Sequence, residues 1–246
     1  RRVLPSHGRS QAPDGDEDAL LGMLLLVIGT RHEAPRPPWW TDIARWTYQS
    51  CRAFLMHLTK EHPTATTSSG LPLRALKLGS CWGGWDCSNP SYHAPGHYQA
   101  FRDYMRAYSA EFSSARTDDE GASLAPLWDA LIETSYLIVS DSQCAATGLV
   151  PNWYVPHASG RGTGSTACSG SGTPAAEFGS EAARTAWRFA VHYLLHADRR
   201  AASFGQPIAS HVSSKLGSYD RTTCSDSTTC SALQLETGCL VTSVHS

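Results

Sequence analysis

Charged side chains are scarce in this chain. They make up 17% of its 246 residues and leave a formal net charge of -2. The Lys and Arg residues stand singly or in pairs, so the sequence has no basic cluster that could follow a phosphate backbone. We therefore exclude nucleic acid as a partner.

A long hydrophobic run is also missing. The longest apolar stretch, from Ala19 to Ile28, is far shorter than the roughly 20 residues that a membrane helix needs. No signal peptide stands at the start, which indicates a mature chain or one that begins inside a longer precursor. We expect no membrane partner. Because 41% of the residues are hydrophobic, we expect a globular core.

Motifs of several other enzyme classes are absent. The sequence contains no Gly-x-Ser-x-Gly elbow, no P-loop and no dinucleotide fingerprint. His192 and His196 stand at i,i+4, but the pattern offers no third ligand to complete a zinc site. We therefore expect neither a metal ion nor a cofactor.

The eight cysteines include no C-x-x-C pair, which argues against zinc and redox chemistry. Cys81 and Cys87, and again Cys224 and Cys230, enclose five residues in segments rich in Gly, Ser or Thr. This spacing predicts two local disulfides, Cys81–Cys87 and Cys224–Cys230. The other four cysteines could pair in ways that the sequence leaves open: Cys51, Cys144, Cys168 and Cys239. So many cysteines predict a secreted, extracellular protein.

Apolar residues at steps of three and four predict a mainly helical fold. The helical patterns cover residues 14–28, 43–58, 98–112, 128–139, 180–197 and 201–216. At the start of the first of these segments, Asp14 and Glu17 are typical of a capping box. The near-continuous apolar run that follows predicts that this helix is buried on most sides. The last pattern is interrupted near Pro207.

The helical patterns also predict which side chains are buried. Three tryptophans on the periodic segments are expected in the core: Trp46, Trp128 and Trp187. The pattern over 180–197 places one set on a common apolar face: Ala186, Ala190, Tyr193, Leu194 and Ala197.

Three long segments, 60–97, 141–177 and 217–246, are rich in Gly, Ser, Thr, Pro and Trp and are expected to be irregular. Helices that alternate with long loops favour an α-helical toroid whose loops build a cleft at one end. We interpret residues 1–246 as a single domain of this kind.

Four segments carry motifs with a common resemblance. They are A-P-D-G-D-E-D-A at 12–19, the run from W-G-G-W to N-P-S-Y-H-A-P at 82–95, G-L-V-P-N-W at 148–153 and E-A-A-R-T-A-W-R at 181–188. In this order they resemble the signature blocks of glycoside hydrolase family 8, a family of cellulase-like enzymes, over roughly residues 12–198. The resemblance implies an all-α, (α/α)6-barrel-like toroid, here short at both ends, with disulfide-bearing loops. It also implies inverting, endo-acting hydrolysis of β-1,4-linked glucan.

The resemblance assigns two catalytic residues. Asp14, the first Asp of the acidic block, is implied to contact the sugar at the cleavage point; the alternative is that it only caps its helix. Glu181 matches the position of the general base, where the family usually has Asp. The alternative for Glu181 is an exposed ion pair with Arg184 at i,i+3, worth about a few tenths of a kcal/mol.

Two sets of side chains are expected to bind the polysaccharide. Arg184 and Arg188 share the helical face of Glu181 and could orient its carboxylate. Four aromatic residues lie in the expected loops and offer flat faces to sugar rings, with core packing as the alternative: Trp82, Trp85, Tyr92 and Trp153.

The general acid has no match in the sequence. The family takes it from an S-E-G-x-G-Y-G-like segment before the acidic block, whereas thirteen residues precede Asp14 and Ser6-His7-Gly8 does not fit. Two functions therefore remain. One is a β-1,4-glucan hydrolase, and the other is a non-catalytic carbohydrate-binding or structural protein on the same scaffold. We expect retained binding of β-glucan with weak cleavage.

Overall fold

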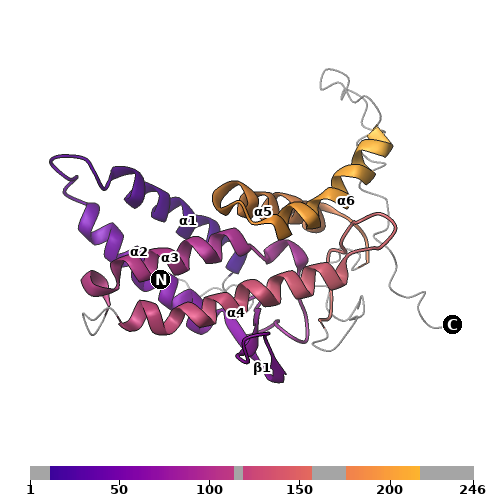
Figure 1. Cartoon of the computed structure of the whole chain (residues 1–246), viewed down its shortest axis with the longest axis horizontal. Helices are drawn as coiled ribbons and strands as arrows, with labels where there is room; N and C mark the ends of the chain where they lie inside the picture. Colours follow the sequence, from indigo (N-terminus) through magenta and orange to yellow (C-terminus); the bar gives the residue numbers. More distant parts are fainter. Residues whose placement is uncertain (1–11, 114–118, 157–175, 217–246) are drawn as a thin grey trace, which may run out of the picture. The chain divides into compact units, whose positions relative to one another are not determined.

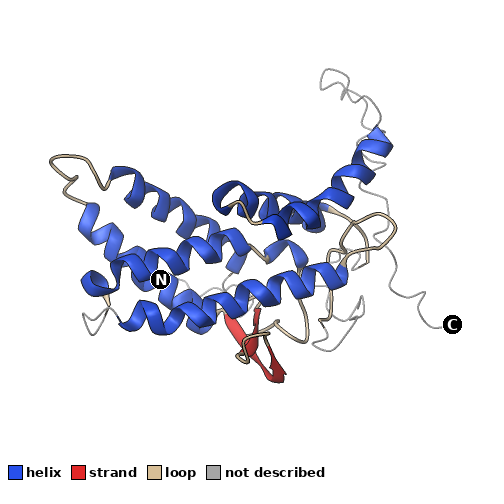
Figure 2. Ribbon diagram, in the orientation of Figure 1, coloured by secondary structure: helices blue, strands red, loops and turns tan. Residues whose placement is uncertain are grey.

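The computed structural model describes residues 12–113, 119–156 and 176–216. Helices dominate this part of the chain, and a two-stranded hairpin is its only sheet (Figure 2). The predicted all-α class is therefore confirmed. The chain divides into two compact units. The first unit comprises Arg1–Gly83 and His97–Thr134, and the second comprises Gly84–Gly96 and Ser135–Ser246.

The helices of the described residues lie close to the predicted segments (Figure 1). Their bounds are α1 Pro13–Thr30, α2 Trp40–His57, α3 Pro95–Phe112, α4 Asp119–Ser142, α5 Ser180–His196 and α6 Arg199–Leu216. In the first unit α1 packs against α2. In the second unit α5 packs against α6 and against a short 3-10 helix, η2, at Pro90–Tyr92.

A hairpin occupies part of the segment 60–97, so the expectation of irregular structure there is wrong. Strand β1 at Thr59–Thr66 pairs antiparallel with β2 at Pro72–Leu76. The connection turns at Gly70, whose φ is 82° and whose N–H donates to the Thr67 carbonyl at 3.0 Å. The strands form because β-branched threonines and a run of buried residues in β2 suit a pleated, half-buried surface.

The start of α1 differs from the prediction. The helix begins at Pro13 with Ala12 as its N-cap, and no side chain caps it. The predicted capping box of Asp14 and Glu17 is therefore wrong. Glu17 is instead fully buried and accepts a hydrogen bond from the Tyr98 hydroxyl at 3.0 Å. A long-range partner has replaced the local one.

The core of the first unit uses one stripe of each helix. Leu25 and Leu26 of α1 are 50% and 46% exposed, so the predicted burial of α1 on most sides is wrong. Trp46 is also half exposed and its predicted core position is wrong. The buried stripe of α2 runs along another face: Ala44, Tyr48, Cys51 and Leu55. Trp128 is fully buried and stacks on Phe54, with 6.3 Å between ring centroids, which confirms its core position.

The core of the second unit is centred on Phe189 of α5. Its ring lies 4.4 Å from that of Phe204 in α6 and 5.0 Å from that of Tyr136 in α4, measured between centroids. These contacts turn a different stripe of α5 inward from the predicted one. Leu194, a member of the predicted face, is 77% exposed, and Trp187 is 51% exposed. Both predictions are wrong because packing partners on other elements select the buried face.

The cysteines correct one predicted pairing. Cys51 and Cys81 carry free thiols, so the predicted Cys81–Cys87 bond is wrong. Cys81 is exposed whereas Cys87 is buried. Cys87 and Cys144 are each disulfide-bonded. The predicted Cys224–Cys230 bond lies outside the described residues.

The two neighbouring histidines of α5 have structural partners. His192 Nδ1 lies 2.8 Å from the Tyr136 hydroxyl, and His196 Nε2 lies 3.0 Å from the carbonyl oxygen of Gly96. Within the described ranges, no group of three or more His, Cys, Asp or Glu side chains is placed to hold a metal ion. No helix in that part of the chain has the length and apolarity needed to cross a membrane.

Candidate active site

The N-terminus of α5 is capped by a residue far away in the sequence. Its N-cap residue, Gly179, has no side chain that could accept hydrogen bonds from the first turn. Asn152 does so instead: its Oδ1 accepts from the backbone N–H of Gly179 at 3.1 Å and of Ala182 at 3.0 Å. Asn152 is fully buried, and a Cβ on Gly179 would lie 2.9 Å from its side-chain nitrogen. This close contact fixes where α5 begins.

Glu181, in the first turn of α5, is held by a second distant asparagine. The Asn89 Nδ2 donates to Glu181 Oε2 at 2.9 Å. The Asn89 Oδ1 accepts from the backbone N–H and the hydroxyl of Ser91, at 3.0 and 2.7 Å. Because its oxygen is occupied locally, the fully buried Asn89 presents its amide nitrogen to the carboxylate.

Arg184 completes the immediate surroundings of Glu181. Its Nη2 donates to the same oxygen, Oε2, in a pair that confirms the predicted i,i+3 contact. Glu181 stands in the first turn of α5. The side chains of Glu181 and Arg184 are 26% and 38% exposed. Among the described residues, Glu181 Oε1 has no hydrogen-bond partner, so one oxygen of an oriented carboxylate remains available to water.

An aromatic ring lies beside this ion pair. The guanidinium carbon of Arg184 is 5.5 Å from the centroid of the partly exposed Tyr92 ring, within the range of a cation–π contact. Glu181 and Tyr92 therefore flank one guanidinium group. The structure thus brings together three of the predicted site residues, one acidic, one basic and one aromatic.

Two other predicted site residues of the second unit are buried. Trp153 and Arg188 are 4% and 2% exposed, and the Arg188 guanidinium lies 4.7 Å from the centroid of the Trp187 ring. Trp85 is partly exposed. The contacts of these three side chains with substrate stay a prediction. The burial of Trp153 matches the alternative of core packing.

Two predicted residues belong to the first unit. Asp14 lies partly buried in the first turn of α1. Trp82 is 42% exposed, and its carbonyl accepts hydrogen bonds from the N–H groups of Leu78 at 3.1 Å and Gly79 at 3.3 Å. The convergence of Asp14, Glu181 and a loop aromatic residue on one groove stays a prediction.

A buried histidine supports the loop that carries Asn89. His93 Nε2 lies 2.9 Å from the Ser88 hydroxyl oxygen, and its Nδ1 lies 3.0 Å from that of Ser135. Burial lowers the pKa of His93 to about 3. Ser88 also pairs through its backbone with Tyr154, in both directions at 2.7 and 2.8 Å. A neutral imidazole between two hydroxyl groups therefore fastens this loop to α4.

Sequence reasoning missed the residues that position the carboxylate. Asn89 and Asn152 stand inside the quoted motifs, but their side chains were not predicted to act. A signal was available, since each is a polar residue in an apolar or proline-containing block, where a side-chain amide needs partners. The partners themselves are 92 and 30 residues away and could not be read from the sequence.

We expect Asn152→Ala to lower the free energy of unfolding by about 1–2 kcal/mol, because two N–H groups of the α5 N-terminus lose their acceptor. Urea unfolding followed by circular dichroism measures this loss. Asn152→Asp, which keeps an acceptor and adds a charge suited to a helix N-terminus, is the matched control and should lose less. Equal stability of Asn152→Ala and the unchanged protein would contradict the capping role.

Comparisons with known proteins point to one group of enzymes. No family model matches the chain. Among curated proteins it is similar to Endoglucanase 2 of Ruminiclostridium josui, 31% identical over 130 residues, and to Endoglucanase A of Acetivibrio thermocellus, 32% identical over 132 residues. Each alignment covers 51% of this chain and 21% of the relative. The chain therefore spans about a fifth of the length of these relatives.

Solved structures show the same fold. Rex8A from Paenibacillus barcinonensis, complexed with xylose, aligns with a TM-score of 0.54 and 18% identity. A mutant of Rex8A, complexed with an arabinofuranosyl-xylotetraose, aligns with a TM-score of 0.53 and 19% identity. Both alignments cover 86% of this chain and 47% of the solved one. The chain has the helical fold of about half of Rex8A.

Proposed function

We propose that this chain is part of an inverting, endo-acting hydrolase of β-1,4-linked glucan. Its resemblance to glycoside hydrolase family 8, its endoglucanase relatives and its fold support this proposal. Glu181 is the general base of this reaction. Asp14 contacts the sugar at the cleavage point. The polysaccharide is the substrate, and the reaction needs no cofactor.

One observation carries the proposal. Three sequence blocks that resemble those of the family, far apart in the chain, meet at the start of α5. The block at 148–153 supplies the cap through Asn152, the block at 82–95 supplies Asn89, and the block at 181–188 supplies Glu181 and its arginine. An ordinary surface ion pair would not require two buried asparagines from other segments. The arrangement supports a carboxylate that is held in one orientation for chemistry.

The geometry suits the work of a general base. An inverting glycosidase needs a carboxylate that takes a proton from the attacking water, opposite a second carboxyl group that protonates the leaving oxygen. Glu181 Oε2 is fixed by two donors, while Oε1 can accept from water. Arg184 and Asn89 therefore hold one carboxylate oxygen in place and leave the other for the water. Tyr92, beside Arg184, offers a flat face to the sugar at this position.

We propose that the protein is secreted, since an extracellular site of action fits both a polysaccharide substrate and the eight cysteines of the chain. Growth medium and cell lysate compared by immunoblot test the location. Recovery of the protein only from the lysate would contradict it.

Product analysis tests the proposed reaction. We expect cellohexaose to be cut at internal bonds, and proton nuclear magnetic resonance to show the α-anomer of the new reducing end before mutarotation. Xylohexaose is the competing substrate and should be cut more slowly. A β-anomer as first product would contradict inversion. Binding of cellohexaose with no new reducing ends, even in long incubations, would favour the non-catalytic alternative.

A further inference from the structure

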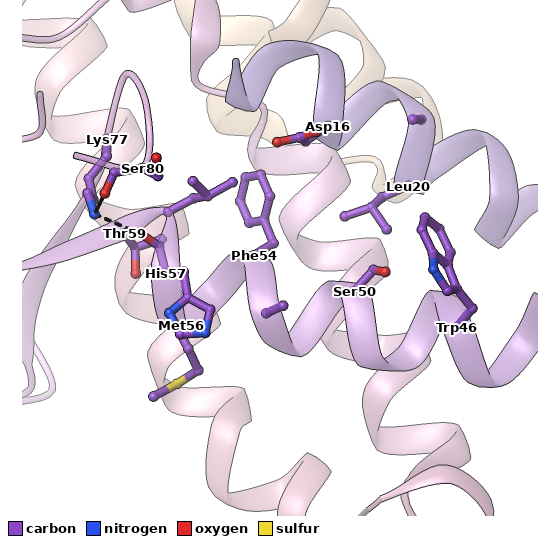
Figure 3. A pocket seen from close by; sticks show the side chains of 13 residues that line it. Asp16, Leu20, Trp46, Ser50, Phe54, Met56, His57, Thr59, Lys77 and Ser80 are labelled. Carbon is purple, nitrogen blue, oxygen red and sulfur yellow. Dashed lines mark hydrogen bonds between the residues drawn. The ribbon is translucent and has the colours of Figure 1, made fainter. Parts of the chain in front are cut away.

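A cavity of about 600 Å3 lies in the first unit, between α1, α2 and the residues that flank the hairpin (Figure 3). This volume is within the range of about 300–1,000 Å3 that is typical of small-molecule sites. The lining contains none of the residues that the sequence assigned to catalysis or substrate binding. It combines an apolar floor of Leu20 and Phe54 with polar side chains at Asp16, Ser50 and His57.

Asp16 is the most unusual group of the lining. Its Oδ2 is buried and has no hydrogen-bond partner among the described residues. Leaving a buried oxygen without a partner is unfavourable, so such groups are expected to meet a ligand or water. Burial, followed by the charge of Asp14, raises the pKa of Asp16. This carboxyl group is therefore poorly solvated. A ligand hydroxyl group could donate the hydrogen bond that its Oδ2 lacks.

Trp46 supplies an aromatic wall to the same cavity (Figure 3). It is 50% exposed, although burial of its ring against the core would have been favourable by hydrophobic transfer. The ring stands on the face of α2 that the core does not use. A flat indole with an open face is the group that stacks on the C–H side of a sugar ring.

The far side of the cavity is braced. Lys77 Nζ donates to the carbonyl oxygens of His57 at 2.9 Å and of Ser80 at 2.5 Å. These bonds tie the end of α2 to the segment after β2 and hold the backbone at His57 and Ser80. The cavity therefore has a preformed edge, which lowers the entropic cost of binding.

We propose that this cavity is a carbohydrate-binding subsite that takes one or two sugar units of a β-linked oligosaccharide. Trp46 stacks on a sugar ring, Asp16 Oδ2 accepts a hydrogen bond from a sugar hydroxyl, and Ser50 and His57 contact neighbouring hydroxyl groups. The choice of a β-linked glucan as ligand rests on the proposed function, whereas the site itself rests on the cavity, the open indole and the unsatisfied carboxyl oxygen.

Calorimetric titration with cellohexaose tests the subsite. We expect Trp46→Ala to weaken binding about tenfold or more and Asp16→Asn to weaken it about threefold, since stacking and one hydrogen bond are lost. Trp46→Tyr, which keeps a flat ring, should bind more tightly than Trp46→Ala. Trp39→Ala is the matched control: Trp39 is 38% exposed, stands at the start of the same helix and does not line the cavity. Circular dichroism of each variant reports its folding.

The outcomes separate this inference from the proposed function. Equal affinity of Trp46→Ala, Asp16→Asn and the unchanged protein overturns the subsite, even if cleavage persists and depends on Glu181. Equal losses in Trp39→Ala and Trp46→Ala overturn it as well. Loss of binding in Trp46→Ala, with full binding in Trp39→Ala, supports the subsite even if no variant cleaves the sugar. If a lysine-rich peptide bound more strongly than cellohexaose, Asp16 would be assigned to a cationic ligand. That result would overturn the proposal that the cavity binds a carbohydrate.

Discussion

Glu181→Gln is expected to reduce the cleavage of 2,4-dinitrophenyl β-cellobioside about a thousandfold, because the variant cannot take a proton from the attacking water. This substrate has a leaving group that needs no general acid, so its cleavage reports the base alone. Glutamine can still accept from Asn89 and Arg184, which hold Oε2 in the unchanged protein. The loss should therefore appear in kcat, with folding and affinity nearly unchanged.

Two further variants serve as controls for this result. Glu181→Asp places the usual residue of the family at the base position and should retain more activity than Glu181→Gln. Glu111→Gln removes an exposed carboxylate of α3 and should leave the rate unchanged. If Glu181→Gln cleaved the substrate within about threefold of the unchanged protein, the assignment of the base would be wrong.

Acid is expected to destabilise the second unit through His93. Its folded-state pKa is about 3, below the value of about 6.5 for an unfolded chain. The unfolded state therefore binds more protons between these values, and stability falls as the pH drops. The contribution is fully present above about pH 6.5 and decreases by about 1.4 kcal/mol per pH unit below it.

Urea unfolding of the unchanged protein and of His93→Gln between about pH 6.5 and about pH 5 measures this contribution. Glutamine cannot titrate but keeps a donor and an acceptor for the hydroxyl groups of Ser88 and Ser135. The stability difference between the two proteins should shrink by about 2 kcal/mol over this interval. A difference that stays constant with pH would show that His93 does not remain neutral in the fold.

Local patterns predicted most of the fold. The helices over Tyr98–Phe112 and around Trp128 follow the three–four step of apolar residues and lie where expected. The hairpin after α2 was missed because its threonines also suit a loop, and its strands form only by pairing with each other. Which face of α5 is buried depends on Phe204 and Tyr136, and such partners cannot be read from the periodicity of α5 itself.

In the candidate site, too, the local contacts could be predicted from the sequence, whereas the long-range contacts could not. Glu181 and Arg184 share one helical turn, so their spacing predicted the contact that the structure shows. The asparagines that orient the carboxylate act across long stretches of chain, and only the fold brings them to α5. For Trp46 the local pattern misled. Its position on a periodic helix predicted burial, but the buried stripe of α2 runs along another face.

Chemical rescue tests whether the held carboxylate of Glu181 is the base of an inverting glycosidase. Glu181→Ala leaves space beside the sugar and removes the base, so an added anion can attack in place of activated water. With sodium azide and 2,4-dinitrophenyl β-cellobioside, we expect restored turnover and α-cellobiosyl azide as the product. Turnover of Glu181→Ala that equals that of the unchanged protein without azide, or a β-cellobiosyl azide product, would contradict it.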